Sequence, residues 1–329
     1  MNTNNQDYIC TVLLIAYNHK ENIKIAIESV LRQKTQYKYK IHIFDDASTD
    51  GTSDIIREYA AKYPDIIVPF IAQTNGGAQQ NIWNAYKSVD TKYCAQLECD
   101  DYWCDSEKLQ LQIDAMEENP DCSFCAHNTL YVNINDSYRL EEDGKLFVYN
   151  QNVRNTGKYQ PEDFTCLYGA GWMHHGNSRL IRMGVVDLAA LDEKEDFLYD
   201  NCQFFYLLSR GKLYYIQRIM STYCMNISGT FTSLSVQNKI SSHFERLMHI
   251  NQSTNREFEQ TIFRHLVSFA KYWFKLDDVA QGAMRGNSKL SAVFMKWYKK
   301  ATYDERLQNQ LKRQARANTA ELMAEIKGI

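Results

Sequence analysis

The sequence predicts an α/β fold in which a mostly parallel, Rossmann-like sheet is flanked by helices, followed by a helical C-terminal region. Strand-like and helix-like segments alternate strictly from residue 9 to residue 118. The first strand-like segment, ICTVLLIA, is continuously apolar, as expected of a strand that is covered on both faces. Strict alternation is typical of a doubly wound sheet, in which ligands bind beyond the carboxyl ends of the strands.

Each element of the first part is predicted from its apolar pattern and its boundary residues. Apolar residues at helical spacing in 22–33, and a helical pattern that stops before Pro120, are the clearest helix signals. The strands are expected at residues 9–16, 40–44, 66–72 and 93–97. The helices are expected at residues 22–33, 50–62, 78–88 and 106–118.

The later part of the chain has a less regular pattern. Residues 123–182 are expected to form strands with loops, 197–209 a helix, and 212–223 one or two strands. From residue 236 onward the sequence is mostly helical and lacks strand signals. We therefore expect one domain over residues 1–235, with halves 1–120 and 121–235, and a helical region over residues 236–329.

Composition excludes several classes of protein. The 329-residue chain has a formal net charge of −3, which gives no reason to expect a nucleic-acid partner. No apolar run approaches the ~18 residues that a membrane span needs. The first seven residues, MNTNNQD, lack the basic and apolar regions of a signal peptide. A cytoplasmic location is therefore expected.

An acidic stretch follows the fourth expected strand. Glu98, Asp100 and Asp101 fall within four residues, and like charges this close repel one another. One interpretation is a site for a hard divalent cation, which prefers oxygen ligands. The other is a solvated acidic turn that also caps the helix expected near Ser106. This stretch alone does not decide between the two.

Polar residues also follow the other expected strands. Asp45 and Asp46 end the second strand, and a Ser/Thr/Asp-Gly turn then opens a helix. Capping by residues 48–50 would explain the turn but not the two carboxylates. Asn18 and Asn75 follow the first and third strands. Four polar clusters are thus expected at one edge of the sheet.

These motifs, in this order and spacing, resemble those of the family-2 glycosyltransferases, which have the GT-A fold. The resemblance extends over residues 8 to 230. It is carried by Ala16-Tyr17-Asn18, by Asp45-Asp46-Ala47-Ser48-Thr49-Asp50-Gly51-Thr52, by Asn75-Gly76-Gly77, and by Glu98-Cys99-Asp100-Asp101-Tyr102-Trp103 followed by Lys108-Leu109.

The resemblance implies an inverting transfer of a sugar from a nucleotide-sugar, most commonly a UDP-sugar, to a hydroxyl of a glycan or lipid-linked acceptor. It also implies Mn²⁺ or Mg²⁺ as cofactor, and a place in bacterial surface polysaccharide synthesis. Residues 1–120 would bind the donor and residues 121–235 the acceptor. Asp46 would contact the base, and Asp100 and Asp101 the metal. The implied donor-site residues are Ala16, Tyr17, Asn18, Asp46, Asn75, Gly77, Glu98 and Asp100.

The general base that takes the acceptor proton is expected in a later segment. Asp200 opens an apolar helix, a context that resembles the family's third motif. Alternatives are a pure capping role for Asp200, or Asp196 or Glu195 as the base. The candidate acceptor-binding residues are Trp103, Trp172, His174 and His175.

The sequence departs from the family pattern after Tyr223. Many relatives place an arginine and then a histidine there, whereas this chain has Cys224-Met225-Asn226. A cation that could offset the charge of the leaving diphosphate is therefore missing. Lys212, Arg218 or a C-terminal residue could take its place.

Basic residues accumulate in the C-terminal region. Residues 296–317 contain seven Lys or Arg and two acidic residues. A solvated helix face, peripheral contact with an anionic membrane at its inner face, and self-association through apolar positions are the three interpretations.

Two other functions compete with sugar transfer. A sugar nucleotidyltransferase would be expected to carry a Gly-rich, basic loop just after the first strand. This chain has YNHKEN at that position, which argues against this function. A non-catalytic nucleotide- or glycan-binding protein on the same fold is the second alternative, and Asp200 argues against it.

Overall fold

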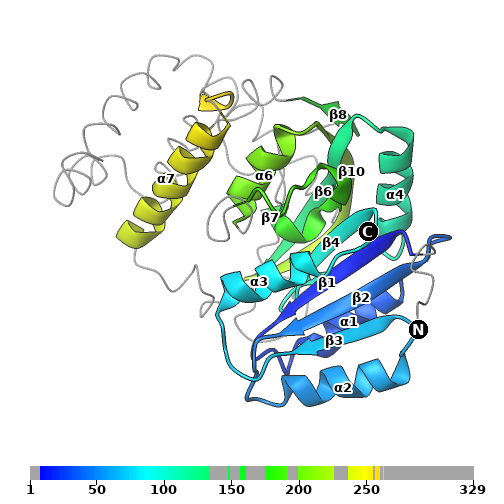
Figure 1. Ribbon diagram of the computed structural model, residues 1–329. Helices are drawn as coiled ribbons and strands as arrows, with labels where there is room; N and C mark the ends of the chain where they lie inside the picture. The colour runs from blue at the N-terminus through cyan, green and yellow to red at the C-terminus, as the bar shows by residue number, and fades with distance from the viewer. Residues whose placement is uncertain are drawn as a thin grey trace. The chain divides into compact units, whose positions relative to one another are not determined.

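The structure is a computed structural model, and it describes residues 8–133, 147–148, 156–160, 175–191, 199–225, 236–254, 256–259 and 262. The chain falls into two compact units. The first unit contains the sheet and the helices packed on it (Figure 1). Helix α7 (Val236–Ser253) belongs to the second unit. The structural description below concerns the first unit unless α7 is named.

In the described residues of the first unit, ten strands form one sheet, and their order across the sheet differs from their order along the chain (Figure 1). The central order is β3-β2-β1-β4-β9-β6-β10-β5, while β7 pairs with β6 and β8 with β10. The strands are β1 (Cys10–Ala16), β2 (Tyr39–Asp45), β3 (Ile67–Ile71), β4 (Tyr93–Glu98), β5 (Tyr102–Trp103), β6 (Cys122–Asn133), β7 (Phe147–Val148), β8 (Gly157–Tyr159), β9 (Leu180–Arg182) and β10 (Lys212–Met225).

The strands β3, β2, β1 and β4 are parallel neighbours, so their carboxyl ends lie at one edge of the sheet. β9 then runs antiparallel between β4 and β6, and β10 is parallel to β6. The registers align the last residues of the parallel strands: Ala16 pairs with Asp45, Asp45 with Ile71, and Ile15 with Glu98.

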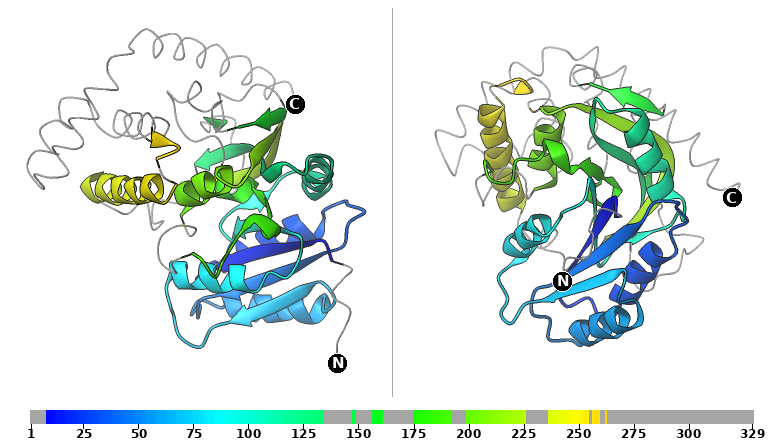
Figure 2. Two further views of the ribbon diagram at one scale, coloured as in Figure 1. Left: turned by 45° about the horizontal axis from the view of Figure 1, so that its top comes forward. Right: turned by 45° about the vertical axis from the view of Figure 1, so that its right-hand side comes forward.

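Helices cover both faces of the sheet (Figure 2). Helix α1 contacts α2 on one face, and Gln33, two residues after the end of α1, accepts the Leu109 amide of α4 at its Oε1 over 3.0 Å. Helices α3 and α6 are joined on the other face, where Gln203 Nε2 donates to the Tyr86 hydroxyl over 2.8 Å. The helices are α1 (Ile23–Leu31), α2 (Thr52–Lys62), α3 (Ala78–Lys87), α4 (Lys108–Glu118) and α6 (Asp200–Leu208).

The predicted doubly wound architecture is confirmed, and each expected element of residues 9–118 is present with its ends within about two residues. Residues 212–223, expected as one or two strands, form part of the single strand β10. Part of the expected C-terminal helical region is described as α7, whereas the basic segment 296–317 lies outside the described residues. Within the described ranges, no helix combines the length and apolarity that crossing a bilayer requires.

A buried lysine lies in the core on the α1–α4 side of the sheet. Lys108 is 0% exposed, its Nζ lies 3.9 Å from the centre of the Trp103 ring, and it donates to Gln112 Oε1 over 2.6 Å. Burial lowers the pKa of Lys108 to about 7. Gln112 in turn donates to the carbonyl oxygen of Ser178 over 2.8 Å, so Lys108 supports a contact between α4 and the segment before β9.

Replacement of Lys108 by Met is expected to change how stability depends on pH. Because the folded state binds this proton more weakly than the unfolded state, the stability of the wild type should rise between pH 7 and pH 10.5. The expected contribution is at most ~1.4 kcal/mol per pH unit. Urea unfolding at several pH values gives the free energy of unfolding, which should rise less steeply with pH in Lys108→Met than in the wild type. An equal dependence on pH in the two proteins would contradict this account of Lys108.

Candidate active site

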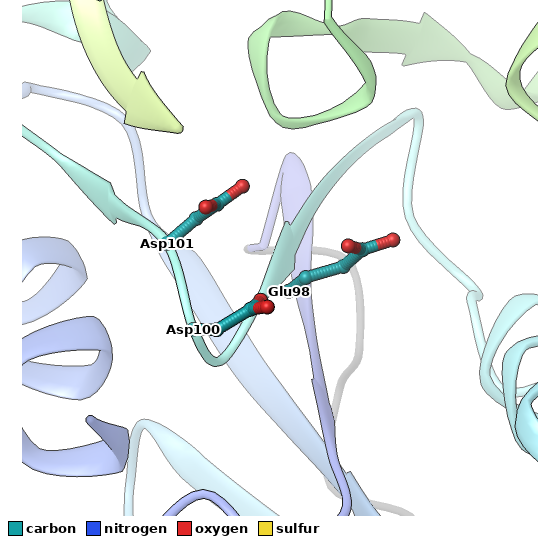
Figure 3. Close-up of side chains that lie close together, drawn as sticks. All are labelled: Glu98, Asp100 and Asp101. Atoms are coloured by element: carbon teal, nitrogen blue, oxygen red, sulfur yellow. The ribbon is translucent and has the colours of Figure 1, made fainter. Parts of the chain in front are cut away.

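The end of β4 and the turn after it bring three carboxylates together. One side-chain oxygen from each of Glu98, Asp100 and Asp101 lies within 4.8 Å of the others. Figure 3 shows the three side chains projecting to the same side of the chain. The turn is closed by the amide of Asp101, which donates to the carbonyl oxygen of Glu98 over 3.0 Å. We call Glu98, Asp100 and Asp101 the acidic cluster.

Asp101 is the most firmly held member of the acidic cluster. It is 1% exposed, and its two oxygens accept hydrogen bonds from the Cys224 amide and from Asn177 Nδ2, both over 2.8 Å. His175 Nδ1 lies 3.9 Å from Asp101 Oδ2, and its imidazole packs on the Tyr223 ring with 4.3 Å between the ring centres. Residues of β10 and of the segment before β9 therefore fix a carboxylate that follows β4.

The electrostatics of the acidic cluster favour a bound cation. Burial, followed by repulsion from Asp100 and Asp200, raises the pKa of Glu98 to about 8. Burial and the neighbouring carboxylates also raise the pKa of Asp101 well above its usual range. An oxygen-only donor set with repelling charges fits a hard divalent ion, which supplies the missing positive charge. The capping alternative fails, because no cluster side chain caps α4, which begins at Lys108.

A second group of predicted residues meets beyond β2. Asp46 is 4% exposed, and its two carboxylate oxygens accept the backbone N–H groups of Gly76 and Gly77, each over 2.8 Å. Asn75 Oδ1 also accepts the Gly77 N–H over 3.0 Å. Gly77 has a φ of 86°, a conformation that side chains disfavour. The loop after β3 is therefore fastened to the end of β2 by Asp46.

The loop after β1 is bonded to the loop after β2. Asn18 donates its amide to Ser48 Oγ and accepts the Thr49 amide at its Oδ1, both over 2.8 Å. Asn18 and Ala47 both have positive φ, 55° and 59°, so each loop turns sharply here. The preceding residue, Tyr17, is 46% exposed. An exposed aromatic ring thus lies next to two cross-linked loops at the carboxyl edge of the sheet.

Asp200, the expected base, is the first residue of α6, and its side chain is half exposed. Its Oδ1 accepts a hydrogen bond from Arg179 Nη1 over 3.3 Å. The negative charge of Asp200 interacts electrostatically with the acidic cluster, because it contributes to the raised pKa of Glu98. The alternatives Asp196 and Glu195 lie outside the described residues. A capping role is not seen, because the N-cap position of α6 is Tyr199 and it makes no side-chain cap.

The sequence predicted no individual role for Asn177 or Arg179, which lie in the segment between His175 and β9. This segment forms a 3₁₀ turn, η2 (Gly176–Ser178), and both side chains are almost fully buried. Asn177 holds Asp101, and Arg179 holds Asp200, so one short turn contacts both the acidic cluster and the expected base. The available signal was the polar run GNSR directly before an apolar strand.

The expected acceptor residues have different outcomes. Trp103 is 0% exposed and packs in the core under Lys108, so it does not face the site; its apolar ring is better accommodated away from water. Trp172 and His174 lie outside the described residues. His175 lies beside Asp101, and burial lowers its pKa.

The two cations proposed to replace the missing arginine are engaged elsewhere. Lys212 pairs with Asp121 over 3.0 Å. Arg218 pairs with Asp105 over 2.5 Å and with Glu107 over 2.9 Å. All three acidic partners lie within three residues of the ends of α4, at Lys108 and Glu118, rather than in the acidic cluster.

The fold is that of known nucleotide-sugar enzymes. TarS from S. aureus, solved in complex with UDP-GlcNAc, superimposes with a TM-score of 0.63 over 95% of this chain and 88% of its own, at 14% identity. The mannosyltransferase PcManGT from Pyrobaculum calidifontis, solved with GDP-Man and Mn²⁺, gives a TM-score of 0.52 over 94% of this chain and 86% of its own, at 14% identity. At such identities the similarity establishes the GT-A fold alone.

Curated relatives match part of the chain. An uncharacterised protein of Mycobacterium tuberculosis is 38% identical over 117 residues, which is 36% of this chain and 34% of that protein. WfgD of Escherichia coli, a UDP-Glc:α-D-GlcNAc-diphosphoundecaprenol β-1,3-glucosyltransferase, is 28% identical over 151 residues, which is 46% of this chain and 57% of WfgD. The matches thus span between a third and somewhat more than half of these relatives. Residues 11–187, more than half of the 329 residues, match the family described as Glycosyl transferase family 2, and the chain belongs to that family.

Proposed function

We propose that this protein is a metal-dependent, inverting glycosyltransferase that moves a hexosyl or N-acetylhexosaminyl group from a UDP-sugar to a hydroxyl of a glycan or lipid-linked acceptor. The observation that carries the proposal is the acidic cluster, whose three carboxylates lie together around the buried Asp101, with the charge of Asp200 acting on Glu98. Displacement at a sugar carbon requires a base for the acceptor proton and a positive charge, here a metal ion on the acidic cluster, that stabilises the leaving diphosphate.

In this proposal Asp100 and Asp101 hold Mn²⁺ or Mg²⁺, and Glu98 lies beside the donor ribose or reaches the ion through water. When bound, the ion would stabilise the negative charge that grows on the leaving nucleoside diphosphate. The raised pKa of Glu98 supports this assignment, because it marks a site where an added positive charge is favourable. PcManGT, which shares the fold, was solved with Mn²⁺.

The carboxyl edge of β1, β2 and β3 would bind the nucleoside. Tyr17 is exposed there, and Asp46 fixes the Gly76-Gly77 turn while each of its oxygens keeps a further lone pair. Ala16, Asn18, Asn75 and Gly77 would complete this part of the site. The choice of UDP is supported by the UDP-Glc donor of WfgD and by the UDP-GlcNAc complex of TarS.

Asp200 would take the proton from the attacking acceptor hydroxyl. Its half-exposed side chain supports this role, because a base must be reachable by the acceptor. The acceptor is proposed to be a lipid-linked glycan, because WfgD acts on an α-D-GlcNAc-diphosphoundecaprenol acceptor. We further propose that residues 1–120 bind the donor, that residues 121–235 bind the acceptor, with His174, His175 and Trp172 on that side, and that residues 236–329 contact the cytoplasmic membrane face or a second copy of the chain.

Binding of Mn²⁺ should depend on pH. Because the pKa values of Asp101 and Glu98 are raised, a metal ion must compete with protons for the acidic cluster, so the affinity should rise with pH by up to ~10-fold per unit for each proton released. Titration of Mn²⁺ at pH 6, 7 and 8 measures this directly. Asp121→Asn, which changes an acid paired with Lys158 and Lys212, should leave the affinity unchanged, and Asp101→Asn should abolish it. An affinity for Mn²⁺ that does not change with pH would contradict the assignment of the metal ion to the acidic cluster.

Replacement of Asp200 by Asn should remove the proposed base while nearly preserving the size and shape of the side chain. We expect turnover to fall ~10²–10⁴-fold. The KM for UDP-glucose should change by less than about twofold, because the base acts only after the donor has bound. The measurement is release of UDP with Mn²⁺ and an α-GlcNAc-diphospholipid acceptor. Asp114→Asn is the matched control, because it is the same substitution at a carboxylate that bonds to Tyr37 and Gln110 and lies outside the proposed site. Its turnover should equal that of the wild type.

Two results would overturn parts of this function. Near-wild-type turnover of Asp200→Asn would show that the base is another residue. Binding of UDP and Mn²⁺ without any release of UDP from UDP-sugars would favour the non-catalytic alternative.

A further inference from the structure

The guanidinium of Arg179 is buried against the start of α6. Arg179 is 1% exposed, and Nη2 donates to the carbonyl oxygen of Asp200 over 2.8 Å, while Nη1 donates to its Oδ1 over 3.3 Å. One guanidinium therefore contacts both the backbone and the carboxylate of the same residue. A planar fork that bonds two oxygens fixes direction as well as distance.

A chain of buried polar side chains fixes Arg179 in turn. Nη1 also donates to Gln203 Oε1, one turn along α6 from Asp200. Gln203 Nε2 donates to the Tyr86 hydroxyl on α3, and that hydroxyl donates to Gln96 Oε1 on β4, both over 2.8 Å. Gln96 and Glu98 are two residues apart on one strand and so share a face of the sheet. The chain of hydrogen bonds thus runs from the strand of the acidic cluster to Asp200.

Gly176 bounds the Asp200 carboxylate from another direction. A Cβ placed on Gly176 would lie 2.5 Å from Asp200 Oδ1, closer than real contacts allow. The backbone of the 3₁₀ turn therefore lies against the carboxylate, and any larger residue at 176 would displace it. The same turn carries Asn177, which bonds to Asp101.

We propose that Arg179 and Gly176 are positioning residues, which fix the direction of the Asp200 carboxylate relative to the acidic cluster through the single turn formed by residues 175–179. This inference rests on the proposed role of Asp200 as the base. Arg179 does not act on the substrate: its two hydrogen-bond donors to Asp200 and its contact with Gln203 are used inside the protein. Geometry errors of ~1 Å at a reacting group reduce rates by up to ~100-fold.

The test measures turnover and binding separately. Arg179→Met should lower kcat for UDP release from UDP-glucose by ~100-fold. Arg179→Lys, which keeps the charge but loses the fork, should lower kcat by ~10-fold. The Kd of UDP with Mn²⁺, measured by calorimetry, should stay within about twofold in both variants, because the acidic cluster is unchanged.

Gly176→Ala provides a second test that leaves Arg179 intact, should Arg179→Met fail to fold. Its Cβ must push the carboxylate aside, so kcat should fall while UDP and Mn²⁺ still bind. Gly184→Ala is the matched control, because a Cβ there meets nothing within 4 Å. Arg182→Lys is the control for loss of a guanidinium, since Arg182 bonds to Cys122, Met116 and Asn119 carbonyls and the Tyr93 hydroxyl, and not to Asp200.

A double-mutant cycle separates positioning from a general structural role. If Arg179 acts through Asp200, Arg179→Met should cause no further loss of kcat in an Asp200→Asn background. Multiplied losses would overturn the inference, as would full turnover of both Arg179→Lys and Gly176→Ala. If instead Asp200→Asn itself keeps near-wild-type turnover, the proposed base fails, and with it the reason to position Asp200.

Discussion

Repulsion among the three carboxylates after β4 is the constraint on which this edge of the sheet depends. Asp101 is buried with hydrogen bonds to both oxygens, and burial together with the neighbouring carboxylates raises the pKa of Glu98 to about 8. Neither arrangement stabilises the fold by itself, since burial of like charges is unfavourable without a partner. The surrounding contacts, from β10 and from the turn before β9, hold the carboxylates in an arrangement that is unfavourable without a cation. This arrangement is what a cation site requires.

The topology explains why these supports come from distant parts of the sequence. β9 is only three residues long, yet it runs antiparallel between β4 and β6 and so brings the 175–179 turn to the acidic cluster. β5 joins the residues after Asp101 to β10, where the Cys224 amide meets the carboxylate. The position of the missing arginine is therefore occupied by a residue whose backbone, rather than its side chain, contacts the site.

The sequence predicted the first four strands and their helices well, because long apolar runs and helical periodicity are strong local signals. It also predicted the acidic cluster, and it placed Asp46 and Gly77 at one edge, where they bond to each other. Asn177 and Arg179 were missed, since a three-residue strand has no periodic pattern and contacts over 76 residues leave no local trace. Trp103 was misjudged because the strand β5 turns its ring into the core rather than toward the edge.

The central claim is that the acidic cluster joins a metal ion to the diphosphate of the donor. Phosphorus NMR of UDP bound to the protein in the presence of Mn²⁺ tests it directly, because a paramagnetic ion broadens the signals of phosphorus atoms close to it. The account predicts broadening of both UDP phosphorus signals in the wild type, and its loss in Asp101→Asn when UDP is still bound. The same broadening in Asp101→Asn would contradict the claim.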